Sequence, residues 1–173
     1  FKLIRSRLDV ANIELGTARG EAIDARGTGR RFSHVMAIAP NASSSIIMGN
    51  TSPSVEPYRA NAYRQDTLSG SYLNKNKHLD ALIKSKVEEN KRLDYKEKEV
   101  YKTAMEIDQR WVIEHASTRQ EWIDQSQSIN LFFRPTVNIK YLHAVHYLAW
   151  KQGMKTLYYC RSEKLGKADK ISQ

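Results

Sequence analysis

The sequence of 173 residues contains one cysteine, Cys160. A single thiol excludes an internal disulfide and a cysteine-rich metal site. No apolar run approaches the roughly 18 residues that a membrane-spanning helix needs, and the first residues lack the pattern of a secretory signal. We therefore expect a protein of the reducing cytoplasm that has no membrane partner.

Several nucleotide and metal motifs are also missing. The sequence has neither a glycine-rich dinucleotide fingerprint nor a P-loop. His143 and His146 lie three residues apart, but no acidic residue or cysteine follows at a matching spacing. We expect these histidines on a surface or in a core, and no cofactor in this chain.

The net charge of +9 favours anionic partners. Lysine and arginine are dispersed rather than gathered in one block, and in the middle of the chain they alternate with acidic residues, which is typical of solvated helix faces. An alternative is a small basic nucleic-acid-binding module. Such a module needs basic and aromatic residues on one face, whereas the aromatics here mostly occupy apolar-patterned positions, so we expect no direct nucleic-acid partner.

Hydrophobic spacing predicts helices that alternate with short strands. We expect helices over residues 1–15 (ended by Gly16), 75–90, 96–116 (one or two helices), 118–124 and 138–152, and strands over 35–39, 128–133 and 156–160. A further helix is expected to start after residues 41–45, and residues 51–57 form a proline-containing loop. The last strand, helix and strand form a βαβ unit, whose strands run parallel.

Three segments are candidates for chemistry. The turn from Pro40 to Ser45 leads into a helix start, where free N–H groups can bind a phosphate; more often such serines only cap their own helix. Tyr158 and Tyr159 are either two half-buried tyrosines, one of them packed inward on the opposite face of a strand, or a redox pair, because phenols can lose a proton and an electron. Residues 124–128 fit a helix-to-strand loop, and we expect Cys160 to be a small packed residue.

Taken together and in this order, these segments resemble the C-terminal part of the large, catalytic subunit of class I ribonucleotide reductases. The resemblance covers nearly the whole chain. The matching stretches are residues 27–31, 36–47 with the turn Pro-Asn-Ala-Ser-Ser-Ser, 49–58, 68–70, 123–130 with Asp-Gln-Ser-Gln-Ser, and 150–159, which end in Tyr-Tyr.

The resemblance implies an α/β fold: residues 1–161 form the C-terminal part of a ten-stranded α/β barrel, incomplete in this chain, and residues 162–173 form a flexible, polar, basic tail. It also implies reduction of ribonucleoside diphosphates to deoxyribonucleoside diphosphates by radical chemistry for DNA synthesis. Tyr158 and Tyr159 would pass the radical from the small subunit, with Tyr158 nearer the substrate and Tyr159 nearer the subunit interface. The substrate phosphates would be held by Asn41, Ala42, Ser43 and Ser44.

The family's catalytic and redox cysteines match no residue of this chain, and Cys160 is not among them. The resemblance therefore implies that the chain is inactive without the N-terminal part of the large subunit, which also binds the ATP and dNTP effectors. The radical cofactor, a dimetal centre, is expected in the separate small subunit. Thioredoxin or glutaredoxin would reduce the complete enzyme.

Overall fold

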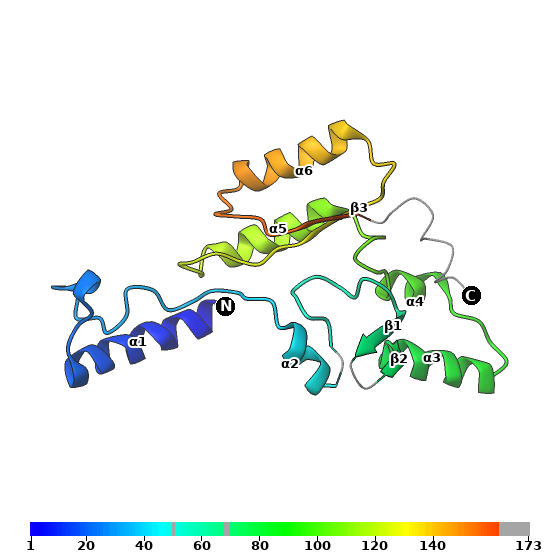
Figure 1. Cartoon of the computed structure of the whole chain (residues 1–173), viewed down its shortest axis with the longest axis horizontal. Helices are drawn as coiled ribbons and strands as arrows, with labels where there is room; N and C mark the ends of the chain where they lie inside the picture. The colour runs from blue at the N-terminus through cyan, green and yellow to red at the C-terminus, as the bar shows by residue number, and fades with distance from the viewer. Residues whose placement is uncertain (50, 68–69, 163–173) are drawn as a thin grey trace.

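The computed structural model describes residues 1–49, 51–67 and 70–162. Apart from Ser162, the tail that the sequence predicts at residues 162–173 lies outside the described residues. Figure 1 shows the elements in chain order, which are α1 (Lys2–Arg19), the short 3-10 helix η1 (Ile23–Ala25), α2 (Ala42–Ile47), β1 (Ala62–Thr67), β2 (Gly70–Lys75), α3 (Lys77–Glu88), α4 (Tyr95–Val100), α5 (Gln109–Gln120), β3 (Leu131–Phe133), α6 (Ile139–Lys151) and β4 (Cys160–Ser162).

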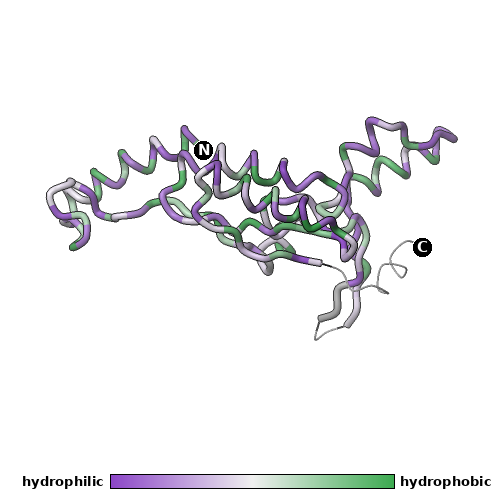
Figure 2. Tube along the Cα trace, turned by 90° about the horizontal axis from the view of Figure 1, so that it is seen from above, coloured by the Kyte–Doolittle hydropathy of each residue, from purple (hydrophilic) through white to green (hydrophobic). Residues whose placement is uncertain are grey.

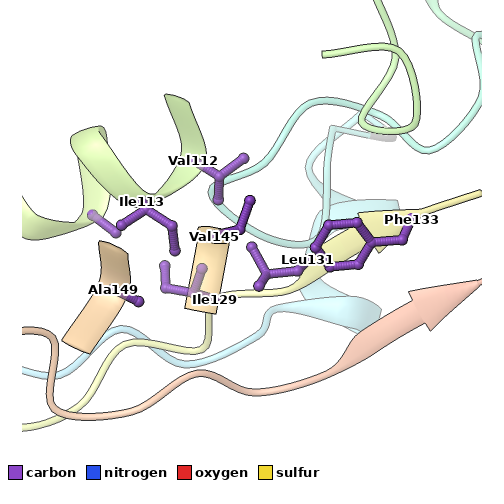
Figure 3. Close-up of a cluster of buried hydrophobic side chains, with 8 residues drawn as sticks. Val112, Ile113, Ile129, Leu131, Phe133, Val145 and Ala149 are labelled. Carbon is purple, nitrogen blue, oxygen red and sulfur yellow. The ribbon is translucent and has the colours of Figure 1, made fainter. Parts of the chain in front are cut away.

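The hydrophobic core lies where α5, β3 and α6 meet. Side chains from the two helices point toward the strand and the residues just before it (Figure 3). The fully or nearly buried members of this cluster are Val112, Ile113, Ala116, Ile129, Leu131, Phe133, Val145 and Ala149. Burial of these apolar side chains is the main stabilising contribution that this part of the chain makes by itself.

The predicted βαβ unit at the end of the chain is confirmed. Strand β3 pairs in parallel with β4, so that Leu131 lies opposite Cys160, and α6 connects the two strands. The side chain of Asn138 accepts a hydrogen bond from the N–H of Lys140 at 2.9 Å and so caps the start of α6. At its other end Gly153 has a φ of +73°, a conformation that favours glycine.

A buried glutamine fixes the start of α5 against β3. The side-chain amide of Gln109 donates to the carbonyls of Ala104 and Ile107, and its oxygen accepts from the N–H of Phe132 at 2.9 Å. Three backbone groups that would otherwise be buried without partners are thereby satisfied. This network joins the start of α5 to β3 at the edge of the core.

The remaining elements extend away from this core toward both ends of the molecule. Helix α1 lies at one end of the long axis, and the antiparallel β1–β2 hairpin lies with α3 toward the other (Figure 1). Hydrophobic residues recur along these outer helices (Figure 2), and several are largely exposed, among them Leu3 and Val87 at 70% and 69%. Among the described residues the sheets are two-stranded and form no closed barrel, as expected for part of a barrel.

The first helix was predicted to end at Gly16, and this is wrong. Helix α1 continues to Arg19 and ends at Gly20, whose φ is +81°. Gly16 is buried instead, and a Cβ at this position would lie 2.0 Å from the carbonyl oxygen of Gly29. Glycine is present here because another backbone segment packs directly against the helix.

The buried strand predicted over residues 35–39 is also wrong. The segment makes one isolated parallel bridge, between Ile38 and Gln127, and Ala37 and Ala39 are exposed. Its backbone pairs with the segment 125–128 at two residues: the Met36 carbonyl accepts from Gln125, and Ile38 donates to Ser126 and accepts from Ser128. Pro40 follows two residues later and has no N–H with which to continue a ladder.

Other helix boundaries differ from the predicted ones because capping residues determine where the helices begin. Asn76 caps α3, so Lys75 belongs to β2 rather than to the helix. The region 96–116 contains α4 and α5, the latter capped by Asp108, and residues 118–124 contain only the end of α5 and a turn. The strand predicted at 128–133 shortens to β3, whereas the one predicted at 156–160 is displaced to β4 and shares only Cys160 with it. The β1–β2 hairpin was not predicted.

We expect Ile113→Ala to lower the free energy of unfolding by about 2–5 kcal/mol, because it removes a fully buried side chain and leaves a cavity. The matched control is Ile139→Ala on α6, where the isoleucine is 73% exposed; we expect a change within about 0.5 kcal/mol there. Urea denaturation followed by circular dichroism measures both. Equal losses in the two variants would contradict the placement of the core.

Candidate functional site

The first turn of α2 presents two serines to solvent. Asn41 occupies the N-cap position, but its side chain makes no capping bond and instead donates to the carbonyl of Ala39 at 3.4 Å. Ser43 and Ser44 are exposed, whereas Ser45 is buried. The first turn of α2 thus offers hydroxyl and backbone N–H donors on its outer side, and these could bind an anion.

Tyr158 and Tyr159 lie in direct contact. Their ring centroids are 4.1 Å apart with an interplanar angle of 54°, and each residue is 50% exposed. The prediction that one ring packs inward on the opposite face of a strand is therefore wrong. The pair immediately precedes β4, which begins at Cys160, so the alternation of a regular strand does not separate the two side chains.

The backbone of this tyrosine pair is fixed to the segment that leads into β3. The N–H of Tyr158 donates to the carbonyl of Ile129, and the carbonyl of Tyr159 accepts from the N–H of Leu131, both at 2.8 Å. Ile129 and Leu131 belong to the buried core. The core therefore determines where the two phenols lie.

The pKa of Tyr158 is raised above its ordinary value. A hydrogen bond with the hydroxyl of Tyr159 is the largest cause, followed by the electrostatic effect of that phenol and by partial desolvation, while Arg161 acts in the opposite direction. The phenol of Tyr158 thus keeps its proton at neutral pH. Any oxidation of this residue must remove a proton together with an electron.

Three residues that the sequence analysis did not single out form a series of contacts that ends at the pair. The guanidinium of Arg161 lies over the ring of Tyr159, 4.8 Å from its centroid, and its Nε donates to Oδ1 of Asn130 at 3.4 Å. The backbone N–H and side-chain amide of Asn130 both donate to the carboxylate of Glu56. Glu56 and Asn130 are 4% and 6% exposed.

Residues 51–57 form a loop, as predicted, but the loop bends at residues 53–56 and is not extended: the Ser52 hydroxyl donates to the carbonyl of Glu56 at 2.7 Å. Within the loop, the carbonyl of Pro53 accepts from the N–H of Asn41 at 2.8 Å. The next residue, Ser54, donates to the carbonyl of Ser128 at 3.2 Å, two residues before the Asn130 that contacts Glu56. The two candidate regions thus share one hydrogen-bonded scaffold.

The polar run at residues 124–128 is the helix-to-strand loop that was predicted. The Asp124 carboxylate accepts from the N–H groups of Val35 and Met36, both at 2.9 Å. Burial alone would raise the pKa of Asp124, but these bonds and the nearby Arg5 outweigh it and lower the pKa. Gln127 is buried and donates to the carbonyl of Ala116, so this run has a structural role.

The remaining candidates show no site. His146 stacks against Phe133 in the core and His143 against Tyr147 on α6. No three histidine, cysteine, aspartate or glutamate side chains are grouped for a metal ion within the described residues. Cys160 is exposed rather than packed, which corrects the prediction made for it.

The barrel domain of ribonucleotide reductase is the family model that matches the chain, over residues 20–160. The chain therefore belongs to the ribonucleotide reductase barrel-domain family, and the resemblance seen in the sequence is confirmed. Within that family its relatives are large subunits. Over 99% of its length the chain is 54% identical to the ribonucleoside-diphosphate reductase large subunit of Invertebrate iridescent virus 6 and 51% identical to that of Invertebrate iridescent virus 3.

Solved structures agree with this assignment. The chain is similar to the alpha subunit of a class Id ribonucleotide reductase from Actinobacillus ureae, with 35% identity and a TM-score of 0.75 over 90% of its length. It covers 20% and 30% of the two viral relatives and 31% of the bacterial subunit. The chain thus spans about a fifth to a third of the proteins that it matches. None of the helices in the described part of the chain is long and apolar enough to cross a membrane.

We expect Tyr159→Phe to lower the pKa of Tyr158 toward the ordinary value of about 10, because the hydroxyl that hydrogen-bonds to Tyr158 is lost. NMR titration of carbon-13-labelled tyrosine rings measures this change. Tyr147→Phe is the matched control, since Tyr147 is an exposed tyrosine on α6 whose ring contacts His143 and Trp150. A pKa that stays the same or rises in Tyr159→Phe would show that the two hydroxyls do not interact.

Proposed function

We propose that this chain forms the C-terminal part of the barrel of a ribonucleoside-diphosphate reductase large subunit, where it supplies a diphosphate-binding turn and a tyrosine radical relay. The complete enzyme reduces ribonucleoside diphosphates to deoxyribonucleoside diphosphates for DNA synthesis. The contact between Tyr158 and Tyr159, 4.1 Å between ring centroids, is the observation that carries this proposal.

The relay needs no charged intermediate. An incoming radical from the small subunit takes one electron and one proton from the Tyr159 hydroxyl and leaves a neutral phenoxyl. The hydrogen of the Tyr158 hydroxyl then moves to the Tyr159 oxygen, which restores Tyr159 and leaves the phenoxyl on Tyr158. The hydrogen bond with Tyr159 raises the pKa of Tyr158, so the Tyr158 hydroxyl holds the proton that this step transfers.

The substrate diphosphate binds at the α2 turn. Ser43 and Ser44 are exposed and offer hydroxyl donors, and the backbone of Asn41 and Ala42 completes the turn. Helix α2 has only six residues, so we give more weight to these donors, and to the match of the turn with the family, than to a helix dipole.

The remainder of the enzyme comes from other components. The N-terminal part of the large subunit closes the barrel, supplies the catalytic cysteines and binds ATP and dNTP effectors. A separate small subunit holds the dimetal radical centre, and thioredoxin or glutaredoxin returns reducing equivalents. We place the assembly in the cytoplasm. The basic charge gives little support to a nucleic-acid-binding module, because cations such as Lys86 and Arg30 are paired with Glu97 and Asp9.

The test uses an assembled reductase, made from this chain, the preceding part of the Invertebrate iridescent virus 6 large subunit and a small subunit. We expect Tyr158→Phe and Tyr159→Phe to abolish turnover but to retain nucleotide affinity, because Phe keeps the ring and cannot readily be oxidised. Ser43→Leu should instead weaken diphosphate affinity by removing a donor and adding bulk. Product formation and equilibrium binding separate the two effects.

The controls address each part of the proposal. Tyr147→Phe should leave both turnover and affinity unchanged, and this chain alone should give no product. Normal turnover in both relay variants would refute the radical role. Unchanged affinity in Ser43→Leu would refute the diphosphate site without affecting the relay.

A further inference from the structure

Arg161 places a cation directly against the tyrosine pair. It lies in β4 opposite Phe132 of β3, and its guanidinium carbon is 4.8 Å from the centroid of the Tyr159 ring. A cation over the face of a phenol is attracted by the negative potential of the ring. The relay as described above does not use this contact.

The guanidinium contacts one buried residue, Asn130, which in turn contacts a second, Glu56. An ionised carboxylate can only accept hydrogen bonds, so Glu56 faces the amide nitrogen of Asn130, at 3.4 Å. The amide oxygen of Asn130 is then directed to the Nε of Arg161. Burial of the Glu56 carboxylate would be costly without hydrogen-bond donors. The side chain of Asn130 therefore keeps its amide nitrogen toward Glu56 as long as the carboxylate is present.

A second guanidinium near Glu56 serves another purpose. The Nε of Arg119 donates to the side-chain oxygen of Gln127 at 3.1 Å, within the helix-to-strand loop. Burial lowers the pKa of Arg119, and the charge of Glu56 opposes this shift. The positive charge of Arg119 therefore offsets the negative charge of the buried Glu56 carboxylate. Asn130, which contacts both Glu56 and Arg161, orients Arg161.

We propose that Arg161 is a positioning residue for the radical relay, oriented by Asn130 and Glu56, and that it holds the Tyr159 ring and favours the phenol of Tyr159 over its phenoxyl radical. This inference rests on the proposed function. Glu56 in the loop at residues 51–57, Asn130 and Arg161 then act together, through successive contacts, to position the ring of Tyr159.

The direction of the effect follows from the charge on the ring. When Tyr159 has lost an electron and a proton to the incoming radical, its ring is poorer in electrons and attracts the guanidinium less. The cation thus stabilises the reduced state of Tyr159. It thereby promotes the return of a hydrogen from Tyr158 and keeps the radical from resting at Tyr159.

The first measurement is independent of the relay. We place 3-fluorotyrosine at position 159 of this chain and record its fluorine-19 NMR signal. Arg161→Gln should shift this signal, and Arg161→Lys, which keeps the charge but loses the planar group, should restore it in part. The matched control is Arg92→Gln, at an exposed arginine between α3 and α4, which should leave the signal in place.

Asn130→Ala tests how Arg161 is oriented. It should shift the fluorine signal in the same direction as Arg161→Gln, by a smaller amount, because the guanidinium loses its acceptor but keeps its charge. This variant also removes partners from a buried carboxylate and can destabilise the fold. Arg161→Gln changes only an exposed side chain and so decides the question if Asn130→Ala does not fold.

The second measurement uses the assembled reductase. Arg161→Gln should lower kcat about two- to fivefold and leave KM unchanged, the size expected for loss of one partly exposed cation–π contact. A fluorine signal or a kcat that matches Arg92→Gln would overturn the inference. If Tyr159→Phe keeps normal turnover, the relay itself fails; if only Arg161→Gln is without effect, the relay stands and the role of Arg161 is refuted.

Discussion

The parallel pairing of residues 129–131 with residues 158–160 is the interaction on which the arrangement of this chain depends. Its two 2.8 Å backbone hydrogen bonds run from Tyr158 to Ile129 and from Leu131 to Tyr159. Ile129 and Leu131 are buried between α5 and α6. Hydrophobic burial therefore fixes one strand, and that strand fixes two exposed phenols through main-chain bonds that do not depend on the side chains they position.

The same segment is also connected by hydrogen bonds to the other candidate region, the first turn of α2. Residues 127–130 bond to Ile38 on one side and to the loop at residues 51–57 on the other, through Ser54 and Glu56. That loop in turn holds the N-cap of α2 through Pro53. A turn suited to a diphosphate and a pair suited to radical transfer thus rest on one scaffold, although more than a hundred residues separate them in the sequence.

Sequence reasoning succeeded where the signals were local. The cap Asn138, the regular apolar stripe of α6 and the terminating Gly153 fix the βαβ unit, and the ordered set of motifs identified the family. The end of α1 was predicted wrongly because, in a sequence, a glycine buried inside a helix cannot be told from a glycine that ends one. What distinguishes Gly16 is the close approach of the Gly29 backbone, which only the tertiary structure shows. The β1–β2 hairpin had a signal, the Ser69-Gly70 dipeptide, that was not used.

The surroundings of the tyrosines could not be predicted in this way. Glu56 and Asn130 are 74 positions apart, and Asn130 and Arg161 are 31 apart, so no periodicity or spacing connects them. Nor does a strand pattern reveal that Tyr158 and Tyr159 touch, because regular alternation predicts opposite faces. These features follow from how the core places distant segments, and only the folded chain brings them together.

The central claim is that the α2 turn and the tyrosine pair serve one catalytic pocket. A structure of the assembled large subunit with a ribonucleoside diphosphate bound tests it most directly. The account predicts the diphosphate at the hydroxyls of Ser43 and Ser44, with the Tyr158 phenol on the same side of the nucleotide-binding cavity. A nucleotide bound to other elements, or a Tyr158 ring that faces away from that cavity, would contradict it.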